Sequence, residues 1–512
     1  MRHHRPRGGH QVTLAALAPE LITLFREAGF TADGIAAHLG PDATEAMHRG
    51  EPAAVRYAAS DDSLLSRLIR FFVLRDALPA TALADLVGAS LATRLLDAGA
   101  VRADRSGTVT PVLDIRPHVI VGENRWIFSD ADASMTQHVP GPDHVLGVGA
   151  ASLSLLQSTP VTPVDTVLDL GTGSGVQALG QVGVATHITA TDIHPRALEL
   201  AAATFAGAGA PVELLQGAWF EPVAGRTFDR IVANPPFVVG LPEVGHVYRD
   251  SGLNLDGASE LVVSQTPEHL APGGTAHLLA AWVHTHEESW ASRVASWLPR
   301  RGVAAWIIER DVADPAHYVG TWLRDESVDP RSPAAAERTQ AWLRHFADHG
   351  VTGIGFGFVA IREIGDEPSD IMAETMPQAF TDPLGPEIDE YFDRIAWLRH
   401  RSAEDLATAT FLARPGLARE DISQADLDAG VGFAPAALRL TRTDGPRWSH
   451  DVDKHLASIV AGLHPQGLSL GEVVGLYAMA NDLDEGQLLE SAIPAVVDLV
   501  RHGLVLPAEL VL

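Results

Sequence analysis

Apolar residues in the first hundred positions recur three and four residues apart, which is the period of an amphipathic α-helix. One apolar face is formed by Leu64, Leu65, Leu68, Ile69 and Phe72. A second face follows at Leu83, Leu86, Val87, Leu91, Leu95 and Leu96. The spacing predicts helices over residues 12–100, and Gly99 is expected to end the last of them because glycine commonly terminates helices.

A short hairpin is expected directly after these helices. The segment VRADRSGTVTP at 101–111 places Ser106 and Gly107 between two β-rich runs, which is a hairpin signal. Helices followed by such a hairpin resemble a winged-helix module, and this likeness concerns the fold alone. We therefore predict a helical, winged-helix-like N-terminal domain over residues 1–140.

The period changes in the middle of the chain, where short, β-rich apolar runs alternate with helical stretches. Strands that are buried on both faces have nearly continuous apolar runs, so the alternation predicts an α/β domain with a doubly wound, mostly parallel sheet. We place this domain at residues 141–363. Its expected strands include 167–170, 187–193, 212–217, 229–237, 275–283, 303–310 and 354–361.

The remainder of the chain, residues 364–512, is predicted to be a mainly helical C-terminal domain. A Pro- and Glu-rich stretch, EIGDEPSD, is expected to link it to the sheet. Near its end, the sequence from 468 to 507 has the pattern of two helices, a glycine and a short strand.

Composition excludes several kinds of chemistry. The 512 residues contain no cysteine and a single lysine, Lys454, so disulfides, thiolate metal sites and cysteine or lysine nucleophiles are not expected. No run of about 18 apolar residues and no basic, apolar leader occurs, so we expect a cytoplasmic protein that does not enter a membrane.

The net charge of −28 is unevenly distributed. Residues 1–140 carry 14 basic and 16 acidic side chains, residues 141–363 carry 13 and 24, and residues 364–512 carry 10 and 25. The acidity therefore lies in the central and C-terminal segments. It disfavours nucleic acid as a partner without excluding it, because the N-terminal segment is nearly neutral.

The segment VLDLGTGSG at 167–175 is the most informative motif. Gly171, Gly173 and Gly175 follow a predicted strand, and glycine allows the positive φ and close ligand approach that a strand-to-helix turn requires. Asp192 ends the next predicted strand 23 residues after Asp169, a spacing suited to binding ribose hydroxyls. The motif predicts nucleotide binding; the alternative is a purely structural turn.

A second motif, Asn234-Pro235-Pro236-Phe237, follows the predicted strand DRIVA. Two prolines cannot continue the ladder of a buried strand, so the chain must leave the sheet here. The carboxyl edge of an open α/β sheet is where ligands bind. The alternative is a rigid strand exit without chemistry.

Together these motifs resemble those of the class I S-adenosylmethionine-dependent methyltransferases. The tetrapeptide resembles motif IV of enzymes that methylate planar nitrogens. VPGPDHVLGVGAAS, VLDLGTGSGVQAL, ATDIHPRALELA and ANPPF are similar to segments of release-factor glutamine N5-methyltransferases and ribosomal guanine N2-methyltransferases with "small" methyltransferase domains. In length the chain is similar to long actinobacterial methyltransferases. The likeness covers about 200 residues, and it implies a Rossmann-like, seven-stranded sheet whose last strand is antiparallel.

The resemblance implies roles for individual residues. Asn234 would orient the acceptor amine, the carbonyl of Pro235 would be a second hydrogen-bond acceptor, and the ring of Phe237 would stack on a planar acceptor. S-adenosyl-L-methionine would be the cofactor, with Asp169 and the glycine loop at its methionine part and Asp192 at its ribose. The residues expected to bind it are Asp169, Gly171, Thr172, Gly173, Gly175, Asp192, Ile193, Ala218, Trp219 and Asn234.

The sequence departs from the family pattern after the third strand of the sheet. Gly217, Ala218 and Trp219 stand where relatives often have an acidic or Asn residue for the adenine amine, so backbone amides and the face of Trp219 or Phe220 are expected to contact adenine. The segment VPGPDHVLGVG at 139–149 is expected to close over the cofactor.

Acceptor contacts are predicted at four further residues. They are Pro236, Tyr248, Arg249 and Asp250, and a solvent-facing loop is the alternative for the last three. No metal site is predicted: His284 and His286, with Glu287, follow a strand and are interpreted as a polar loop.

Three functions remain open from the sequence. The first is an N-methyltransferase acting on a planar amide or amine of a protein, peptide or small metabolite. The second keeps the chemistry with a base of RNA or DNA as the acceptor. The third is a non-catalytic, cofactor-binding regulator, which would not need Asn234. We favour the first; the oligomeric state is not predicted.

Overall fold

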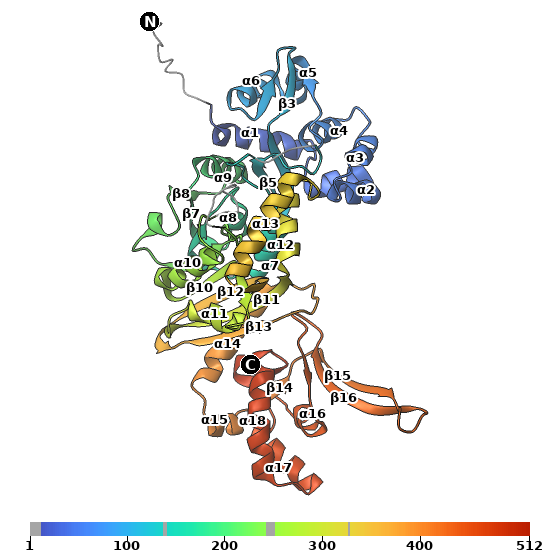
Figure 1. Ribbon diagram of the computed structural model, residues 1–512, viewed down its shortest axis with the longest axis vertical. Helices are drawn as coiled ribbons and strands as arrows, with labels where there is room; N and C mark the ends of the chain where they lie inside the picture. Colours follow the sequence, from blue (N-terminus) through green and yellow to red (C-terminus); the bar gives the residue numbers. More distant parts are fainter. Residues whose placement is uncertain (1–11, 137–140, 242–250, 326–327, 512) are drawn as a thin grey trace. The chain divides into compact units, whose positions relative to one another are not determined.

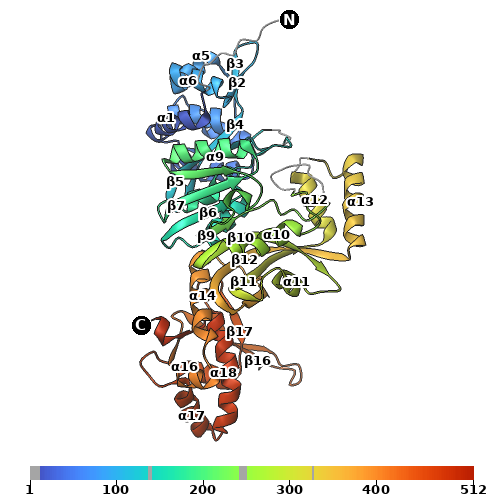
Figure 2. The same ribbon diagram turned by 90° about the vertical axis from the view of Figure 1, so that its left-hand side faces the viewer.

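The computed structural model describes residues 12–136, 141–241, 251–325 and 328–511. Within these residues the chain forms two compact units. The first unit comprises the described residues within 12–156 and 161–374, and the second comprises those within 157–160 and 375–511. The ribbon is drawn in two views (Figures 1 and 2).

The N-terminal segment is helical, as the apolar periodicity predicted, and it ends in the expected hairpin. Strands β2 (Val101–Ala103) and β3 (Thr108–Pro111) pair antiparallel, and β3 also pairs with the short strand β1 (Leu78–Pro79). The helices are α1 (Leu14–Glu27), α2 (Ala32–His48), α3 (Pro52–Ala58), α4 (Leu64–Leu68), α5 (Ala80–Val87) and α6 (Ala89–Asp97), with a π-helical turn η1 at Ile69–Val73.

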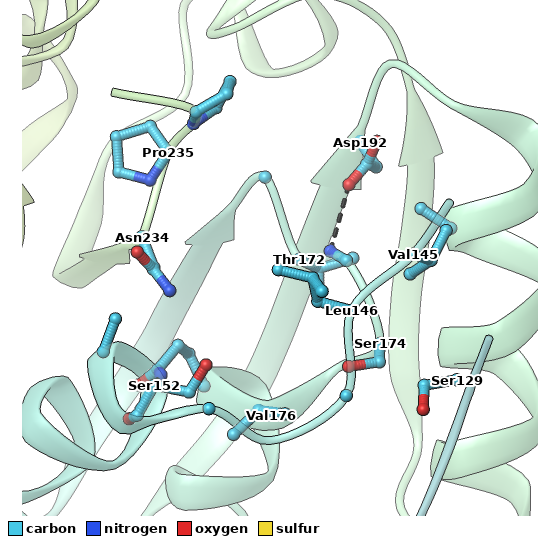
Figure 3. Close-up of a pocket in the computed structure, with 18 of the residues that line it drawn as sticks. Ser129, Val145, Leu146, Ser152, Thr172, Ser174, Val176, Asp192, Asn234 and Pro235 are labelled. Atoms are coloured by element: carbon cyan, nitrogen blue, oxygen red, sulfur yellow. Dashed lines mark hydrogen bonds between the residues drawn. The ribbon is translucent and has the colours of Figure 1, made fainter. Parts of the chain in front are cut away.

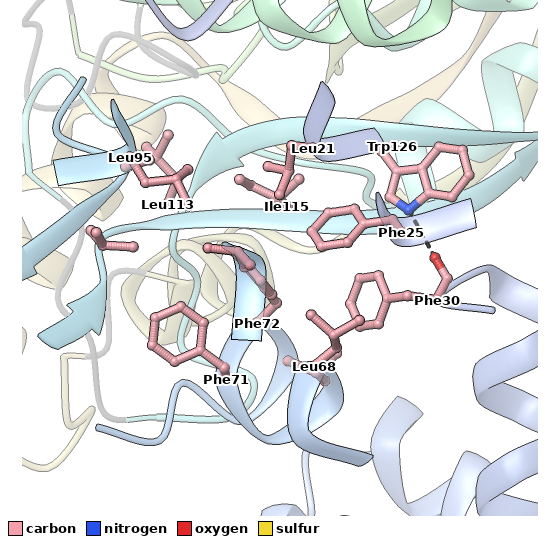
Figure 4. Packing of buried hydrophobic residues seen from close by; sticks show 14 of the residues in the cluster. Leu21, Phe25, Phe30, Leu68, Phe71, Phe72, Leu95, Leu113, Ile115 and Trp126 are labelled. Carbon is pink, nitrogen blue, oxygen red and sulfur yellow. Dashed lines mark hydrogen bonds between the residues drawn. The ribbon is translucent and has the colours of Figure 1, made fainter. Parts of the chain in front are cut away.

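The core of this segment is built around aromatic rings (Figure 4). Phe25 lies 4.7 Å from Phe30 and 5.0 Å from Phe72 between ring centroids, and the indole nitrogen of Trp126 donates to the carbonyl of Phe30 at 2.9 Å. The same apolar cluster includes residues of α9 (Pro195–Ala208), the helix that packs on α1. The N-terminal and central segments therefore lie in one compact unit, and their division into two domains at 140/141 stays a prediction.

The central sheet has eight strands within the described residues, in the order β13-β11-β12-β10-β9-β6-β7-β8. All seven expected strands are present, and β12 is antiparallel to both of its neighbours, as expected. Strands β8, β7, β6, β9 and β10 are parallel in neighbouring pairs. The strands are β6 (Val164–Leu170), β7 (Ala185–Asp192), β8 (Val212–Gln216), β9 (Phe228–Ala233), β10 (Leu270–Thr285), β11 (Arg301–Ala313), β12 (Val351–Pro368) and β13 (Asp370–Thr375).

The eighth strand, β13, was not predicted, and it corrects the expected linker. The stretch EIGDEPSD continues β12 and begins β13, so it belongs to the sheet. Ile371 and Ala373 pack on the apolar cluster beneath the sheet, and the indole nitrogen of Trp306 donates to Glu374 at 2.6 Å. The second unit begins at Thr375, and our boundary at 363/364 stays a prediction.

Alternating residues of the strands bury both faces of the sheet. Val167 and Val232 belong to the cluster that α8 (Val176–Gly180) and α9 cover, whereas Leu168 and Ile231 belong to the cluster that α10 (Gly257–Gln265) and α11 (Trp290–Ser296) cover. This two-sided burial explains why the strands have continuous apolar runs.

The first unit also contains a two-stranded hairpin and three further helices. Strands β4 (Leu113–Ile120) and β5 (Glu123–Asp130) form a hairpin, and α7 (Ala150–Ser158) precedes β6. Helices α12 (Pro315–Asp325) and α13 (Pro333–Asp348) are inserted between β11 and β12, where they pack on each other and on β12 (Figure 2).

The second unit combines helices with an extended hairpin. The expected pattern near the C-terminus is confirmed by α17 (Leu470–Asn481), α18 (Glu485–Arg501), Gly503 and β18 (Val505–Pro507). The hairpin of β15 (Leu417–Ala425) and β16 (Phe433–Arg442) was not predicted. Other elements are α14 (Leu384–Arg399), α15 (Ala403–Thr408), β14 (Phe411–Ala413), β17 (Ser449–Asp451) and α16 (Lys454–Ala461).

Candidate functional site

The glycine loop begins where β6 ends. Gly171, Gly173 and Gly175 have φ values of +72°, +54° and +90°, which glycine adopts without the steric cost that other residues incur. The backbone N–H of Thr172 donates to the carbonyl of Thr191 on β7 at 2.8 Å. The loop is thus held against the neighbouring strand, and Gly171, Thr172 and Gly173 line a cavity of about 650 Å³.

Asp192 connects this loop to the end of β7. Its Oδ2 accepts from the backbone N–H of Gly173 at 3.0 Å, the contact drawn as a dashed line in Figure 3, and its Oδ1 accepts from the N–H of His194 at 2.8 Å. Asp192 also lines the cavity, and burial raises the pKa of its carboxyl.

Asp169 and Gly175, both expected to bind the cofactor, do not line the cavity. Asp169 is buried behind the loop, where its Oδ2 accepts from the hydroxyl of Thr172 at 2.7 Å and from the N–H of Ala178 at 3.0 Å. Burial raises the pKa of Asp169 to about 6. A Cβ at Gly175 would lie 2.8 Å from the ring of Phe205. The observed contacts give these two residues a part in shaping the loop.

The segment after β8 provides another wall of the cavity. Ile193, Ala218 and Trp219 all line it, and Trp219 has a φ of +49°. Phe220 does not line the cavity, because its ring is buried and stacks on His269 with centroids 4.5 Å apart. The alternative adenine contact through Phe220 has no counterpart in the described cavity wall.

The tetrapeptide Asn234–Phe237 follows β9, and all four of its residues line the same cavity as the glycine loop. Pro235 is buried, whereas Asn234 and Phe237 are half-buried. Figure 3 shows Asn234 on the side of the pocket where Ser152 lies, with Thr172 and Asp192 across from it. The two motifs that lie far apart in the sequence are thus brought together in space.

The segment expected to close over the cofactor lies along the cavity from His144 to Gly149; positions 139–140 are outside the described residues. Asp130 holds this segment in place. Its Oδ2 accepts from the N–H of Val145 at 2.9 Å and from Nε of Arg196 at 3.0 Å. One carboxylate therefore ties the segment to the first turn of α9.

Known methyltransferases have sequences similar to the segment that contains the glycine loop and the tetrapeptide. A family model described as the methyltransferase small domain matches residues 146–282. Two further models, each described as a domain of unknown function, match residues 27–112 and 389–507. The release factor glutamine methyltransferase of Bordetella pertussis is 32% identical over 203 residues, which are 36% of this chain and 69% of that protein. The chain belongs to the class I S-adenosylmethionine-dependent methyltransferases.

Other similarities are shorter or weaker. The release factor glutamine methyltransferase of Geobacter sulfurreducens is 35% identical over 122 residues, which are 21% of this chain and 42% of that protein. The chain likewise spans 48% of the relative from Cereibacter sphaeroides, or about half its length. The structure of the T. thermophilus 16S rRNA N2 G1207 methyltransferase in complex with AdoMet and guanosine has 17% identity and a TM-score of 0.27, covering 48% of this chain and 65% of that chain.

A polar face of the hairpin β4–β5, not identified from the sequence, also lines the methyltransferase cavity. Asp114, Arg116 and His118 alternate along β4, with Asp132 just beyond β5. Nε of Arg116 lies 2.8 Å from Asp114, and its Nη2 lies 3.3 Å from Asp132. Burial raises the pKa of Asp114 to about 6 and, together with the charge of Arg116, lowers that of His118 to about 4. The sequence signal was the alternation of polar and apolar residues in LDIRPHVI.

Two predicted loops remain, the acceptor loop at 248–250 and the polar loop at 284–287. Tyr248, Arg249 and Asp250 lie outside the described residues. His284 belongs to β10 and not to a loop, because pairing with β12 carries that strand as far as Thr285, and its Nε2 lies 2.6 Å from Oε2 of Glu309.

Across the described ranges, no group of three or more His, Cys, Asp or Glu residues could hold a metal ion. In the same part of the chain, no helix is long and apolar enough to span a membrane.

Proposed function

We propose that this chain transfers a methyl group from S-adenosylmethionine to a planar amide or amine nitrogen. The observation that carries the proposal is that the glycine loop and all four residues of Asn234–Phe237 line one cavity. The cavity of about 650 Å³ is within the range of small-molecule sites, which span about 300–1,000 Å³.

The residues of the cavity fit the proposed cofactor. Gly171 and Gly173 line the cavity, and a Cβ at either position would meet no atom within 4 Å, so a ligand can approach the backbone closely there. Asp192 uses each carboxylate oxygen for one backbone N–H, and an ionised carboxylate has about four acceptor sites, so it retains capacity for ribose hydroxyls.

The cofactor's other parts would meet the remaining walls. Ile193, Ala218 and Trp219 offer apolar surface suited to the adenine ring, and the loop Gly171–Gly173 would border the methionine part. Asp169 would act behind the loop by holding Thr172 and the N–H of Ala178. When bound, the cofactor supplies a methyl group already attached to a positively charged sulfur, so this chain needs to supply position and electrostatics.

The tetrapeptide suits an acceptor nitrogen whose lone pair is delocalised. The side-chain oxygen of Asn234 and the carbonyl oxygen of Pro235 would accept hydrogen bonds from an NH₂ group. Two such bonds would favour a pyramidal nitrogen, whose lone pair is then localised and able to accept a methyl group. The ring of Phe237 would stack on the planar group and fix its orientation.

A protein or peptide amide is our preferred acceptor. The relatives from B. pertussis and G. sulfurreducens are named for methylation of a glutamine in a release factor, and a glutamine side chain is a planar amide. Residues 141–363 carry an excess of acidic over basic side chains, which opposes the capture of a polyanion.

The proposal is tested by incubating a cell extract with the chain and methyl-tritiated S-adenosylmethionine, then treating the labelled material with protease or nuclease. Label that protease releases, and that is absent with Asn234→Ala, supports a protein acceptor. Label sensitive only to nuclease would assign the acceptor to nucleic acid, and low-mass label would assign it to a metabolite. If the wild-type chain labels nothing above a blank, the proposed activity is wrong.

A further inference from the structure

Helices α12 and α13 form an insertion between two adjacent antiparallel strands. Strands β11 and β12 are neighbours in the sheet, and a tight turn is enough to join such a pair. The chain instead builds two helices, Pro315–Asp325 and Pro333–Asp348, between them. A helical pair of this size that the sheet does not require invites a functional explanation.

The insertion packs directly on the residues that follow the catalytic tetrapeptide. The backbone N–H of Val239 donates to the hydroxyl of Tyr318 on α12 at 2.7 Å. The indole of Trp342 on α13 covers Gly240 so closely that a Cβ there would lie 2.8 Å from the ring. The insertion is therefore joined to the chain two and three residues beyond Phe237.

A cluster of aromatic rings packs around Tyr318, the residue that contacts Val239. Tyr318 is buried, and its ring centroid lies 6.1 Å from that of Trp322, 6.2 Å from those of Trp342 and Phe346, and 5.7 Å from that of Phe356 on β12. Side chains from both helices and from the sheet thus hold one another in position.

One member of this cluster reaches the cavity. Trp322 is half-buried, and it lines the cavity together with Phe237. Both rings also pack on the apolar cluster that contains Val238, Val239 and Tyr318. The acceptor side of the cavity therefore has two partly exposed aromatic rings, one from the tetrapeptide and one from the insertion.

We propose that Trp322 is a specificity-determining residue that, with Phe237, brackets the planar group of the methyl acceptor. Two aromatic walls favour a flat group, such as an amide or an aromatic amine, over a tetrahedral alkyl amine, because only a flat group can stack on a ring. The insertion α12–α13 is then the element that presents Trp322 to the acceptor. This inference rests on the proposed methyl transfer.

The experiment compares Trp322→Phe, which keeps a ring, with Trp322→Leu, which keeps apolar bulk without one. Gln340→Ala, at an exposed position of α13, is the control. For each variant, calorimetry measures the affinity for S-adenosylmethionine, and the initial rate of tritium transfer is measured against increasing amounts of the extract fraction that the wild-type chain labels.

We expect Trp322→Leu to raise the apparent KM for the acceptor about tenfold, while cofactor affinity stays within about twofold of wild type. Trp322→Phe should recover most of this loss, and Gln340→Ala should match the wild type. Equal KM values for the Leu and Phe variants would overturn the inference, as would a parallel loss of cofactor affinity. Failure of the wild-type chain to label anything would instead refute the proposed function, and the inference with it.

Discussion

The carboxylate of Asp192 accepts a hydrogen bond from the backbone N–H of Gly173 at 3.0 Å, so the acid at the end of β7 also fixes the glycine loop after β6. Sequence spacing suggested a ribose contact alone. The structure adds that the same side chain shapes the loop, and substitutions at this position will therefore affect two parts of the cofactor site.

Asp192→Ala should weaken S-adenosylmethionine binding about 10- to 150-fold, because hydrogen bonds to a charged group contribute about 1.5–3 kcal/mol. Asp192→Asn keeps one acceptor oxygen and should lose less. Calorimetric titration with the cofactor measures both. Asp165→Ala, at an exposed position near the other end of β6, should bind as the wild type does. Unchanged affinity in Asp192→Ala would refute the assigned role.

Asn234→Ala should retain cofactor binding and lose methyl transfer. Removing one preorganised hydrogen-bonding group from a catalytic site lowers kcat by about 10²- to 10³-fold. Asn234 is also among the residues expected to bind the cofactor, but its replacement leaves the proposed ribose contact of Asp192 and the adenine wall at Ile193, Ala218 and Trp219 in place. Tritium transfer to the extract measures turnover, and calorimetry measures cofactor affinity. Asn481→Ala, at an exposed position of α17, should match the wild type in both. Turnover at the wild-type rate in Asn234→Ala would show that the mechanism is wrong.

The parts of the fold that the sequence predicts are those where burial dictates the pattern. Strands β6 and β9 are covered on both faces, so their apolar runs are continuous and visible. Strand β13 lies at the edge of the sheet and is half-buried. Its polar residues, Asp370 and Glu374, interrupt the apolar run, so the sequence pattern did not predict a strand there. An edge strand has a less continuous run of apolar residues than a central strand, because it has a neighbouring strand on one side only and is less buried.

The residues of the candidate site likewise fall into those that the sequence predicts and those that it does not. The glycine loop and Asn234–Phe237 are local motifs whose residues are adjacent in sequence, so they are recognisable without a structure. Trp322 lines the same cavity as Phe237 only through the packing of an insertion 85 residues further on, and no local pattern encodes that placement. The burial of Asp169 behind the loop likewise depends on how α8 closes over β6.

Gly175→Ala should destabilise the protein more than Gly183→Ala does. The two glycines have nearly equal φ values, +90° and +92°, so the backbone strain of an added Cβ is matched. At Gly175 that Cβ would lie 2.8 Å from the ring of Phe205, whereas at Gly183 it would meet nothing within 4 Å. Overpacking costs about 1–3 kcal/mol, which a chemical denaturation series would detect.

The double variant Gly175→Ala/Phe205→Leu serves as the control for this collision. Shortening the side chain at 205 relieves the crowding, so the added cost of Gly175→Ala should be smaller in the Phe205→Leu background than in the wild type. Equal destabilisation by Gly175→Ala and Gly183→Ala would mean that the loop shifts freely and that close packing against α9 is not required.

Asp114→Asn should stabilise the protein increasingly as the pH rises. Burial raises the pKa of Asp114 from about 3.8 to about 6, so the folded state holds the proton more tightly than the unfolded state does. Its contribution to stability is complete below about pH 4 and is lost as the pH rises through 6, a change of about 3 kcal/mol. Asparagine does not titrate, so the unfolding midpoint of the variant relative to wild type should rise between pH 4 and 7. A difference that falls between pH 4 and 7 for Asp114→Asn would contradict the raised pKa.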